Sequence, residues 1–199
     1  MLKFLSKRYA VCSDEELMAY LVKGNHKAFE EVYKRYAPYM LRFFYRHLYQ
    51  DNDKAQDFLQ DLFLKVIEKA ESYHSDKAFK IWLYSIASNM CKNEYRRNEI
   101  RGSKVNDFDF SLIMDDSIAF NSQDKFDRNL FNQMLTQELK AMDGVQSLTF
   151  ALRYHDHLSV KEISEIMECA EGTVKSRLFY TIKKLTTKLD IFNPYKEIQ

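Results

Sequence analysis

Apolar residues recur along most of this chain at the 3.6-residue spacing of an amphipathic helix, and this periodicity constrains the fold more than any other feature. It is clearest between Ala55 and Ala70. One continuous buried face is predicted there, made of Phe58, Leu59, Leu62, Phe63, Val66, Ile67 and Ala70. The 199 residues include only 4 glycines and 2 prolines, which favours long helices over a turn-rich β architecture. We therefore expect an all-α protein.

The places where the periodicity fails indicate two small helical domains and a linker. Ser13 and Glu16 form a capping box that starts the first helix, and Pro38 either interrupts the second helix or begins a further segment. From Arg101 to about Arg128, Asp, Ser and Asn are interspersed with isolated apolar residues, and no helical template fits. We predict a domain at residues 13–101, an acidic flexible linker at 102–129 and a second domain at 130–199.

The charges are unevenly distributed, although the formal net charge is only +1. Five basic residues face two acidic ones between residues 91 and 104, and five face one between residues 171 and 189. Between residues 107 and 127, six aspartates face a single lysine. This pattern favours two contacts with a polyanion and one segment that avoids it, although a solvated surface could carry the same charges.

A helix-turn-helix motif is indicated in the second domain. Ser159 and Glu162 form another capping box, and Leu158 and Ile163 are placed as a hydrophobic staple. The stretch "ECAEG" supplies the turn. The predicted buried sides are Ile163, Ile166 and Met167 on the first helix, and Val174, Leu178, Ile182, Leu185 and Leu189 on the second.

The exposed side expected for the second helix of this motif combines cations, a hydroxyl and aromatic rings: Lys175, Ser176, Phe179, Tyr180 and Lys183. Core packing gives no reason for aromatic residues away from the apolar stripe. In a major groove, a hydroxyl or a cation can bond base edges or phosphates, and an aromatic edge can rest on a thymine methyl. The pattern favours DNA reading over a helical hairpin whose rings cover a satellite core.

A polar stripe accompanies the apolar side of the helix expected after the loop "SYHSD". The apolar side comprises Phe79, Trp82, Leu83, Ile86, Ala87 and Met90, and the stripe comprises Ser85, Asn89, Lys92, Asn93, Arg96 and Arg97. By itself, such a stripe is also an ordinary feature of a solvated helix face.

Two segments resemble the extracytoplasmic-function (ECF) sigma factors of bacterial RNA polymerase, which are members of the sigma-70 family. The first, "DKAQDFLQDLFLKVIEKAESYHSDKAFKIWLYSIASNMCKNEYRR", is similar to their core-binding and promoter-melting domain. The second, "LRYHDHLSVKEISEIMECAEGTVKSRLFYTIKKL", is similar to the domain that reads the upstream promoter element. The resemblance runs from Ser13 to about Leu189. It departs at Met142-Asp143, where Leu-Pro is common, and at Ala170, where Ser or Pro often begins the recognition helix.

The resemblance implies roles for individual residues. The clamp helices of the polymerase's largest subunit would be bound by Asp57, Gln60 and Asp61. An unstacked base of the minus-ten element would be read by Asn89 beside a rim formed by the loop Ser72–Lys77, and the strand backbone would be held by Asn93, Arg96 and Arg97. The upstream element would be contacted at its bases by Lys175, Ser176 and Phe179, and at phosphate by Arg177. The exposed pattern of the same helix adds Tyr180 to the candidate DNA contacts.

Core RNA polymerase, promoter DNA and an anti-sigma protein are the partners that the resemblance implies, with no catalytic role, metal or cofactor. The alternative is a helix-turn-helix regulator that acts without replacing the sigma subunit, but no effector-binding αβ pattern precedes Gly102. A metal-dependent hydrolase is a weaker alternative, prompted by His155-Asp156-His157. The three widely spaced cysteines, and the lack of a signal-peptide pattern or of an apolar run of about 20 residues, predict a cytoplasmic protein.

Overall fold

The computed structural model describes residues 9–48, 51–74, 76–101, 130–135, 137–139 and 141–192. Every element in these ranges is a helix, as the periodicity predicts. The chain forms two compact units, residues 1–91 and 92–199, and the division falls within helix α5 (Phe79–Ile100). The predicted linker at 102–129 lies outside the described residues, so the domain limits of 13–101 and 130–199 stay a prediction.

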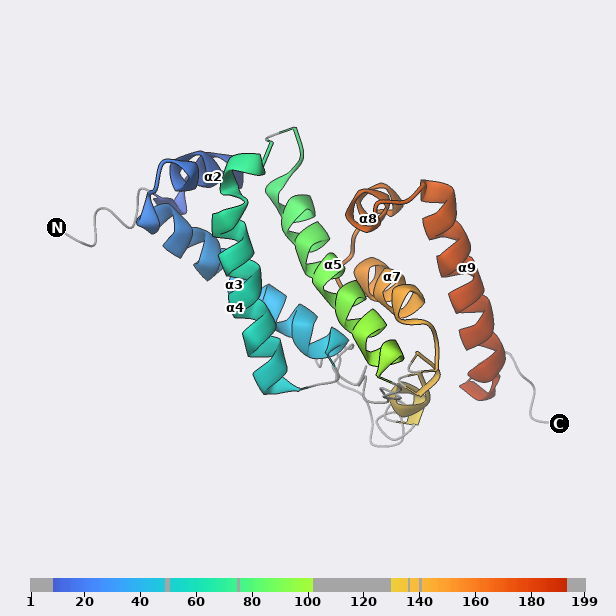
Figure 1. The fold of residues 1–199 in the computed structure, drawn as a ribbon. Coiled ribbons are helices and arrows are strands. Elements are labelled where there is room, and N and C mark those ends of the chain that lie inside the picture. Colours follow the sequence, from blue (N-terminus) through green and yellow to red (C-terminus); the bar gives the residue numbers. More distant parts are fainter. Residues whose placement is uncertain are drawn as a thin grey trace, which may run out of the picture. The chain divides into compact units, whose positions relative to one another are not determined.

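The first unit is built from α2 (Asp14–Val22), α3 (His26–His47), α4 (Asn52–Glu68) and the beginning of α5 (Figure 1). Helix α3 packs against both α2 and α4, and a short 3-10 helix at Ala70–Ser72 precedes the loop into α5. Pro38 lies inside α3, so it neither ends that helix nor begins another. Buried residues on both sides of Pro38, from Val32 to Phe44, hold the helix together because tertiary packing outweighs the missing backbone hydrogen bond.

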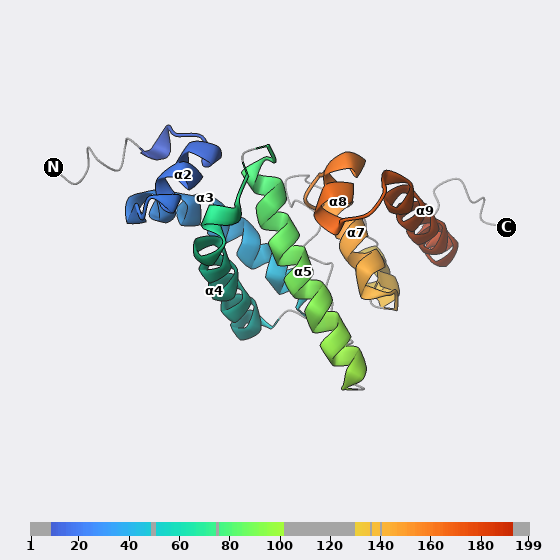
Figure 2. The same ribbon diagram turned by 45° about the horizontal axis from the view of Figure 1, so that its top comes forward.

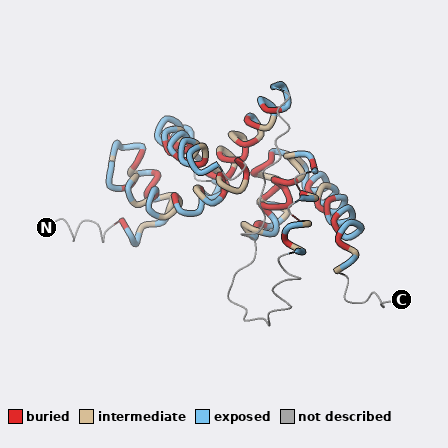
Figure 3. The backbone as a smooth tube through the Cα atoms, turned by 90° about the horizontal axis from the view of Figure 1, so that it is seen from below, coloured by how far each residue is buried: buried red, intermediate tan, exposed pale blue. Residues whose placement is uncertain are grey.

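The core of the first unit consists of large apolar side chains from all four helices. The fully buried ones include Leu17, Met18, Met40, Phe43, Phe44, Leu62, Phe79 and Leu83. Edge-to-face ring contacts join α3 to α5, with centroids 5.6 Å apart for Phe43 and Tyr84 and 5.1 Å apart for Tyr36 and Phe79. Figure 3 shows the buried positions in red, alternating with exposed positions in pale blue along the helices.

The buried face predicted between residues 55 and 70 is confirmed at Leu59, Leu62, Phe63 and Val66 on α4, and at Ala70 in the 3-10 helix that follows. Phe58 is only half-buried. The prediction is wrong for Ile67, which is 48% exposed. Ile67 lies one residue, or about 100° around the helix, beyond Val66. At the end of α4 this rotation carries it past the side that packs against α3.

Residues 9–12, for which the sequence indicated no role, are fastened to α2 and α3 through the Arg35 side chain. Its guanidinium donates to the backbone carbonyls of Tyr9 at 3.1 Å and Ala10 at 3.0 Å. The same group donates to Asp14 Oδ1 at 2.8 Å and to Glu31 Oε1 at 3.0 Å. Tyr9 itself is buried, and its hydroxyl accepts a hydrogen bond of 2.8 Å from Asn25. The segment before α2 is therefore part of the folded unit.

Replacing Arg35 with Ala is expected to lower the free energy of unfolding by about 1–3 kcal/mol, because two partly buried carboxylates and two carbonyls lose one shared donor. Chemical denaturation followed by circular dichroism measures this. The control is Arg42→Ala on the same helix, where the exposed guanidinium bonds Pro38 O and lies over the Tyr39 ring. That change should cost less than about 1 kcal/mol. Equal losses for both variants would contradict a structural role specific to Arg35.

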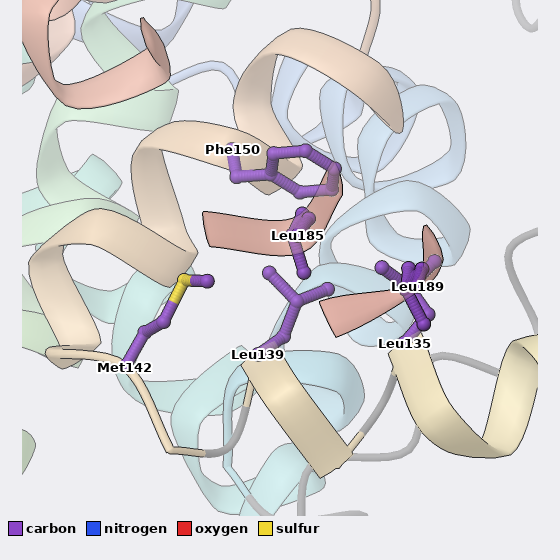
Figure 4. Packing of buried hydrophobic residues seen from close by; sticks show 6 residues of the cluster. All are labelled: Leu135, Leu139, Met142, Phe150, Leu185 and Leu189. Carbon is purple, nitrogen blue, oxygen red and sulfur yellow. The ribbon is translucent and has the colours of Figure 1, made fainter. Parts of the chain in front are cut away.

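The second unit contains the end of α5, α7 (Gly144–Tyr154), α8 (Val160–Met167) and α9 (Glu171–Lys188), and α7, α8 and α9 pack pairwise against one another (Figure 2). Its core includes a cluster that joins residues 135–142 to α7 and to the end of α9 (Figure 4). The cluster consists of Leu135, Leu139, Met142, Phe150, Leu185 and Leu189. No helix in the described ranges has both the length and the apolar character needed to span a membrane.

The apolar stripe predicted on α9 is confirmed at Val174, Leu178, Leu185 and Leu189, and it is wrong at Ile182. Ile182 is 39% exposed, and Thr181 is buried in its place with 2% exposure. A helix of 3.6 residues per turn keeps one side covered by alternating steps of four and three residues. The buried row therefore runs 174, 178, 181, 185 and 189, whereas the prediction took a second step of four after Leu178 and placed Ile182 where Thr181 lies.

Candidate nucleic-acid and polymerase interfaces

Helix α9 presents the residues predicted to read DNA on its exposed side. Lys175 and Ser176 are exposed, and the Phe179 and Tyr180 side chains are 61% and 62% exposed. The two aromatic rings meet edge to face with centroids 5.4 Å apart. Two adjacent exposed rings on one helix make this side a candidate interaction surface. The hydroxyl, cation and ring edges lie within three turns of the helix N-terminus, the part that contacts base edges in this motif.

The turn between α8 and α9 gives the motif its geometry. The second capping box is present: Glu162 N donates to Ser159 Oγ at 3.2 Å, and Ser159 N donates to Glu162 Oε2 at 2.7 Å. Helix α8 ends at Met167, and its C-cap residue Glu168 adopts the left-handed conformation with φ 52°. Ala170 caps α9 without a side-chain hydrogen bond, as expected where Ser or Pro is missing.

Arg177 is placed differently from the other predicted DNA contacts. It is half-buried, and its Nη1 donates to the Cys169 Sγ at 3.7 Å in the turn. The guanidinium therefore lies beside the turn between the two helices of the motif. This position differs from that of the exposed Lys175 and Phe179, and the predicted phosphate contact of Arg177 stays a prediction.

The polar stripe of α5 has a graded exposure. Asn89 is half-buried, while Asn93, Arg96 and Arg97 are exposed. Arg97 Nη1 lies 3.8 Å from Glu94 Oε2, with 68% of the arginine side chain exposed. Partial burial lowers the pKa of the Lys92 ammonium. The stripe therefore has an amide in a partly sheltered position and cations farther along the same helix, and its predicted contacts with a melted strand stay a prediction.

The loop before α5 is closed by a tyrosine whose role the sequence did not reveal. Tyr73 Oη donates to Lys77 O at 2.8 Å, and the ring centroid lies 5.2 Å from that of Trp82. Burial raises the pKa of Tyr73 to about 12, so the phenol stays protonated even at alkaline pH, where an ordinary tyrosine would ionise. Ser75 lies outside the described residues. The one sign of this role in the sequence is that Tyr73 is an aromatic residue at the start of a polar loop.

The exposed side of α4 carries the residues predicted to bind polymerase. Asp57, Gln60 and Asp61 are all exposed, and their spacing places them on one side of the helix. Two apolar side chains continue this side toward the end of the helix, Leu64 with 55% and Ile67 with 48% exposure. The periodicity already places Leu64 three residues beyond Asp61, on the polar side, so its position could have been read from the sequence.

The metal-dependent hydrolase alternative gains no support from the described part of the chain. There, no group of three or more His, Cys, Asp or Glu side chains is arranged to hold a metal ion. His157 adopts a positive φ of 53° in the turn after α7, which fits a tight connection between helices.

Comparison with known families matches both halves of the chain. Sigma-70 region 2 matches residues 32–100, and Sigma-70, region 4 matches residues 132–185. The chain is 30% identical to the ECF RNA polymerase sigma-E factor of Escherichia coli (strain K12) over 185 residues, which cover 89% of this chain and 94% of that protein. The sigma-E factor of Haemophilus influenzae is 28% identical over 192 residues, covering 89% and 95% of the two chains.

Solved structures show the same fold. The sigma factor RpoE from Bartonella quintana, crystallised with the anti-sigma factor NepR, is 25% identical with a TM-score of 0.58. This match covers 83% of the present chain and 99% of that one. CnrH, solved in complex with the cytosolic domain of CnrY, is 19% identical with a TM-score of 0.63 and covers 90% and 98% of the two chains.

Proposed function

This chain belongs to the ECF sigma factors of the sigma-70 family, and on that premise we propose how its own residues carry out transcription initiation. It is a sigma factor that binds core RNA polymerase and directs promoter recognition, melting and initiation. The observation that carries this function is the presence of both sigma-70 regions, in order, on one chain. A helix-turn-helix regulator that leaves the sigma subunit in place is not favoured, because such a protein has no need of region 2.

We assign the two steps of promoter recognition to the two predicted domains. The domain at residues 13–101 would dock on the polymerase clamp helices through the exposed side of α4, and would hold the melted minus-ten strand along α5. Asn89 would receive the unstacked base, and the exposed cations after it would follow the backbone. The domain at 130–199 would read the upstream element through α9, with the linker at 102–129 spanning the two.

The protein is a regulatory subunit, and we propose that it performs no catalytic step of its own and needs no cofactor. It would act in the cytoplasm, where the polymerase transcribes. An anti-sigma protein would hold it inactive, as NepR was found bound to the Bartonella quintana relative.

The assignment is tested with the full chain and purified bacterial core RNA polymerase. We expect the two to co-elute from a sizing column, and the complex to initiate at promoters selected from a random DNA library. A chain that binds DNA alone but never joins core polymerase would favour the ordinary-regulator alternative.

Replacing Lys175 or Phe179 with Ala is expected to weaken binding of the upstream element by roughly 10-fold for each change, because a base contact is lost while the fold is kept. Both side chains are exposed, so folding should not suffer. DNase footprinting of the holoenzyme on a selected promoter measures the loss at the upstream element. Lys188→Ala, an exposed lysine at the other end of α9, serves as the control. An unchanged upstream footprint in both variants would remove these residues from the interface.

Gly172→Ala is expected to change stability and DNA binding in opposite directions. A Cβ at this exposed helical position meets nothing within 4 Å, so the protein itself offers no steric reason for glycine. Alanine should raise the free energy of unfolding by about 0.5–1 kcal/mol, because helical glycine is the less favourable residue. The added methyl would also project from the side of α9 that meets DNA, and should weaken upstream binding. Thermal unfolding and footprinting measure the two effects, and tighter or unchanged DNA binding would contradict the second.

A further inference from the structure

The exposed side of α9 contains a carboxylate among the residues assigned to DNA. Glu171, Lys175 and Phe179 follow one another at steps of four residues, so they form one row along the helix. Glu171 Oε2 lies 3.7 Å from Lys175 Nζ, and the two side chains are 50% and 66% exposed. Glu171 is also the one carboxylate within α9, every residue of which the structure describes. The row therefore begins with an acceptor and continues with a donor.

A carboxylate on a surface that approaches DNA opposes binding, because it repels the phosphates. Its pairing with Lys175 and its place in the first turn stabilise the helix, but exposed pairs of this kind contribute little. A carboxylate has one favourable partner in the major groove, an exocyclic amino group of a base. Cytosine presents such a donor at N4, and the guanine paired with it presents the acceptors O6 and N7 that suit a lysine.

We propose that Glu171 is a specificity-determining residue that accepts a hydrogen bond from a cytosine N4 amino group in the upstream element. Lys175, released from its pairing with Glu171, donates to the O6 and N7 of a neighbouring or paired guanine. The two charges that neutralise each other in the free protein thus become one acceptor and one donor for G·C base pairs. This inference rests on the proposed function, because it requires α9 to enter the major groove.

The location in the motif supports this reading. Residues at the N-terminal end of the second helix contact base edges in helix-turn-helix proteins, and Glu171 is the first residue of α9. The next residue, Gly172, has no side chain, and a Cβ added there would meet nothing within 4 Å. No side chain at that position would therefore hinder the approach of Glu171 to the groove. A glutamate side chain is long enough to extend from this end of the helix toward a base edge.

The test is site selection by holoenzyme, assembled from the full chain and core polymerase, on a library randomised across the upstream element. We expect Glu171→Ala to reduce the preference for cytosine at one position by roughly 5- to 30-fold, and to leave the preferences at other positions in place. Glu171→Gln should move the preference at that position toward adenine, whose N6 and N7 match an amide. The control is Glu165→Ala on α8, which removes the same charge and should leave every base preference unchanged.

The outcomes separate this inference from the proposed function. If wild-type holoenzyme selects an upstream element and Lys175→Ala relaxes it, while Glu171→Ala and Glu171→Gln leave every position as in wild type, the role of Glu171 is overturned and upstream reading by α9 stands. If wild-type holoenzyme selects no upstream element, the proposed upstream reading fails and the role of Glu171 fails with it. A change confined to thermal stability, with base preferences intact, also overturns the inference.

Discussion

Open-complex formation is expected to fall by roughly 10- to 100-fold when Asn89 is replaced with Ala, while binding to core polymerase is unchanged. An amide donates and accepts at once, so it can satisfy two groups on the edge of an unstacked base. Alanine leaves those base groups without hydrogen-bond partners. The hydrogen bonds that offset the free-energy cost of unstacking the base are then lost. Asn89 is half-buried on α5, one turn before the exposed Asn93 and two turns before the exposed Arg96, which places it where a base could be sheltered.

Permanganate reactivity of thymines in the promoter measures melting directly, and co-elution with polymerase verifies that the variant still assembles. Asn93→Ala is the matched control, since it removes the same amide one turn farther along α5 and should cost only a backbone contact. Reactivity equal to wild type in the Asn89 variant would contradict its role in base capture. Equal losses in both variants would show that the stripe holds the strand without a dedicated base contact.

Charge reversal at Asp61 is expected to weaken binding to core polymerase by roughly 100-fold or more. Carboxylates only accept hydrogen bonds, so a surface that receives Asp57 and Asp61 must supply donors or cations. An arginine in place of Asp61 would face those cations with the same sign of charge. Asp61 is exposed in the middle of α4, and the replacement keeps a good helix former there, so the fold should be retained.

Competition for core polymerase against the wild-type chain, followed on a sizing column, measures this loss. Glu165→Arg on α8 serves as the control, because it makes the same change of charge outside α4. Undiminished competition by the Asp61→Arg variant would remove this side of α4 from the interface. Loss of binding in both variants would point to net charge as the cause.

The sequence was sufficient for features that depend on short stretches of chain. Both capping boxes form as predicted, because each involves residues only three positions apart. The exposure of Phe179 and Tyr180 also followed from the periodicity of α9, since rings off the apolar row have no core to enter. The candidate DNA-reading surface of the second unit could therefore be predicted from the order of residues.

The features that the sequence left open or misplaced depend on partners distant in the chain. Pro38 is accommodated within α3 because residues on both sides of it are buried in a helix that packs against α2 and α4. Arg35 gains its role from carbonyls more than twenty residues away. Tyr73 closes its loop in a setting where Trp82 and Phe79 supply the surrounding rings.

Ile67 and Ile182 are positions where the periodicity of the sequence and the packing of the helices disagree. Both belong to apolar patterns that the sequence displays, and both are exposed. Periodicity determines that a helix has an apolar side, because that depends only on 3.6 residues per turn. The packing of neighbouring helices decides how much of that apolar side is buried and at which residue the burial ends. Thr181 is therefore buried while Ile182 is exposed. In this protein the sequence by itself determined the helical character of the chain, the two capping boxes and the exposed rings of α9, because these depend on neighbours a few residues apart. The tertiary structure decided that Pro38 lies within one helix and which apolar residues the core encloses, because both depend on packing between helices.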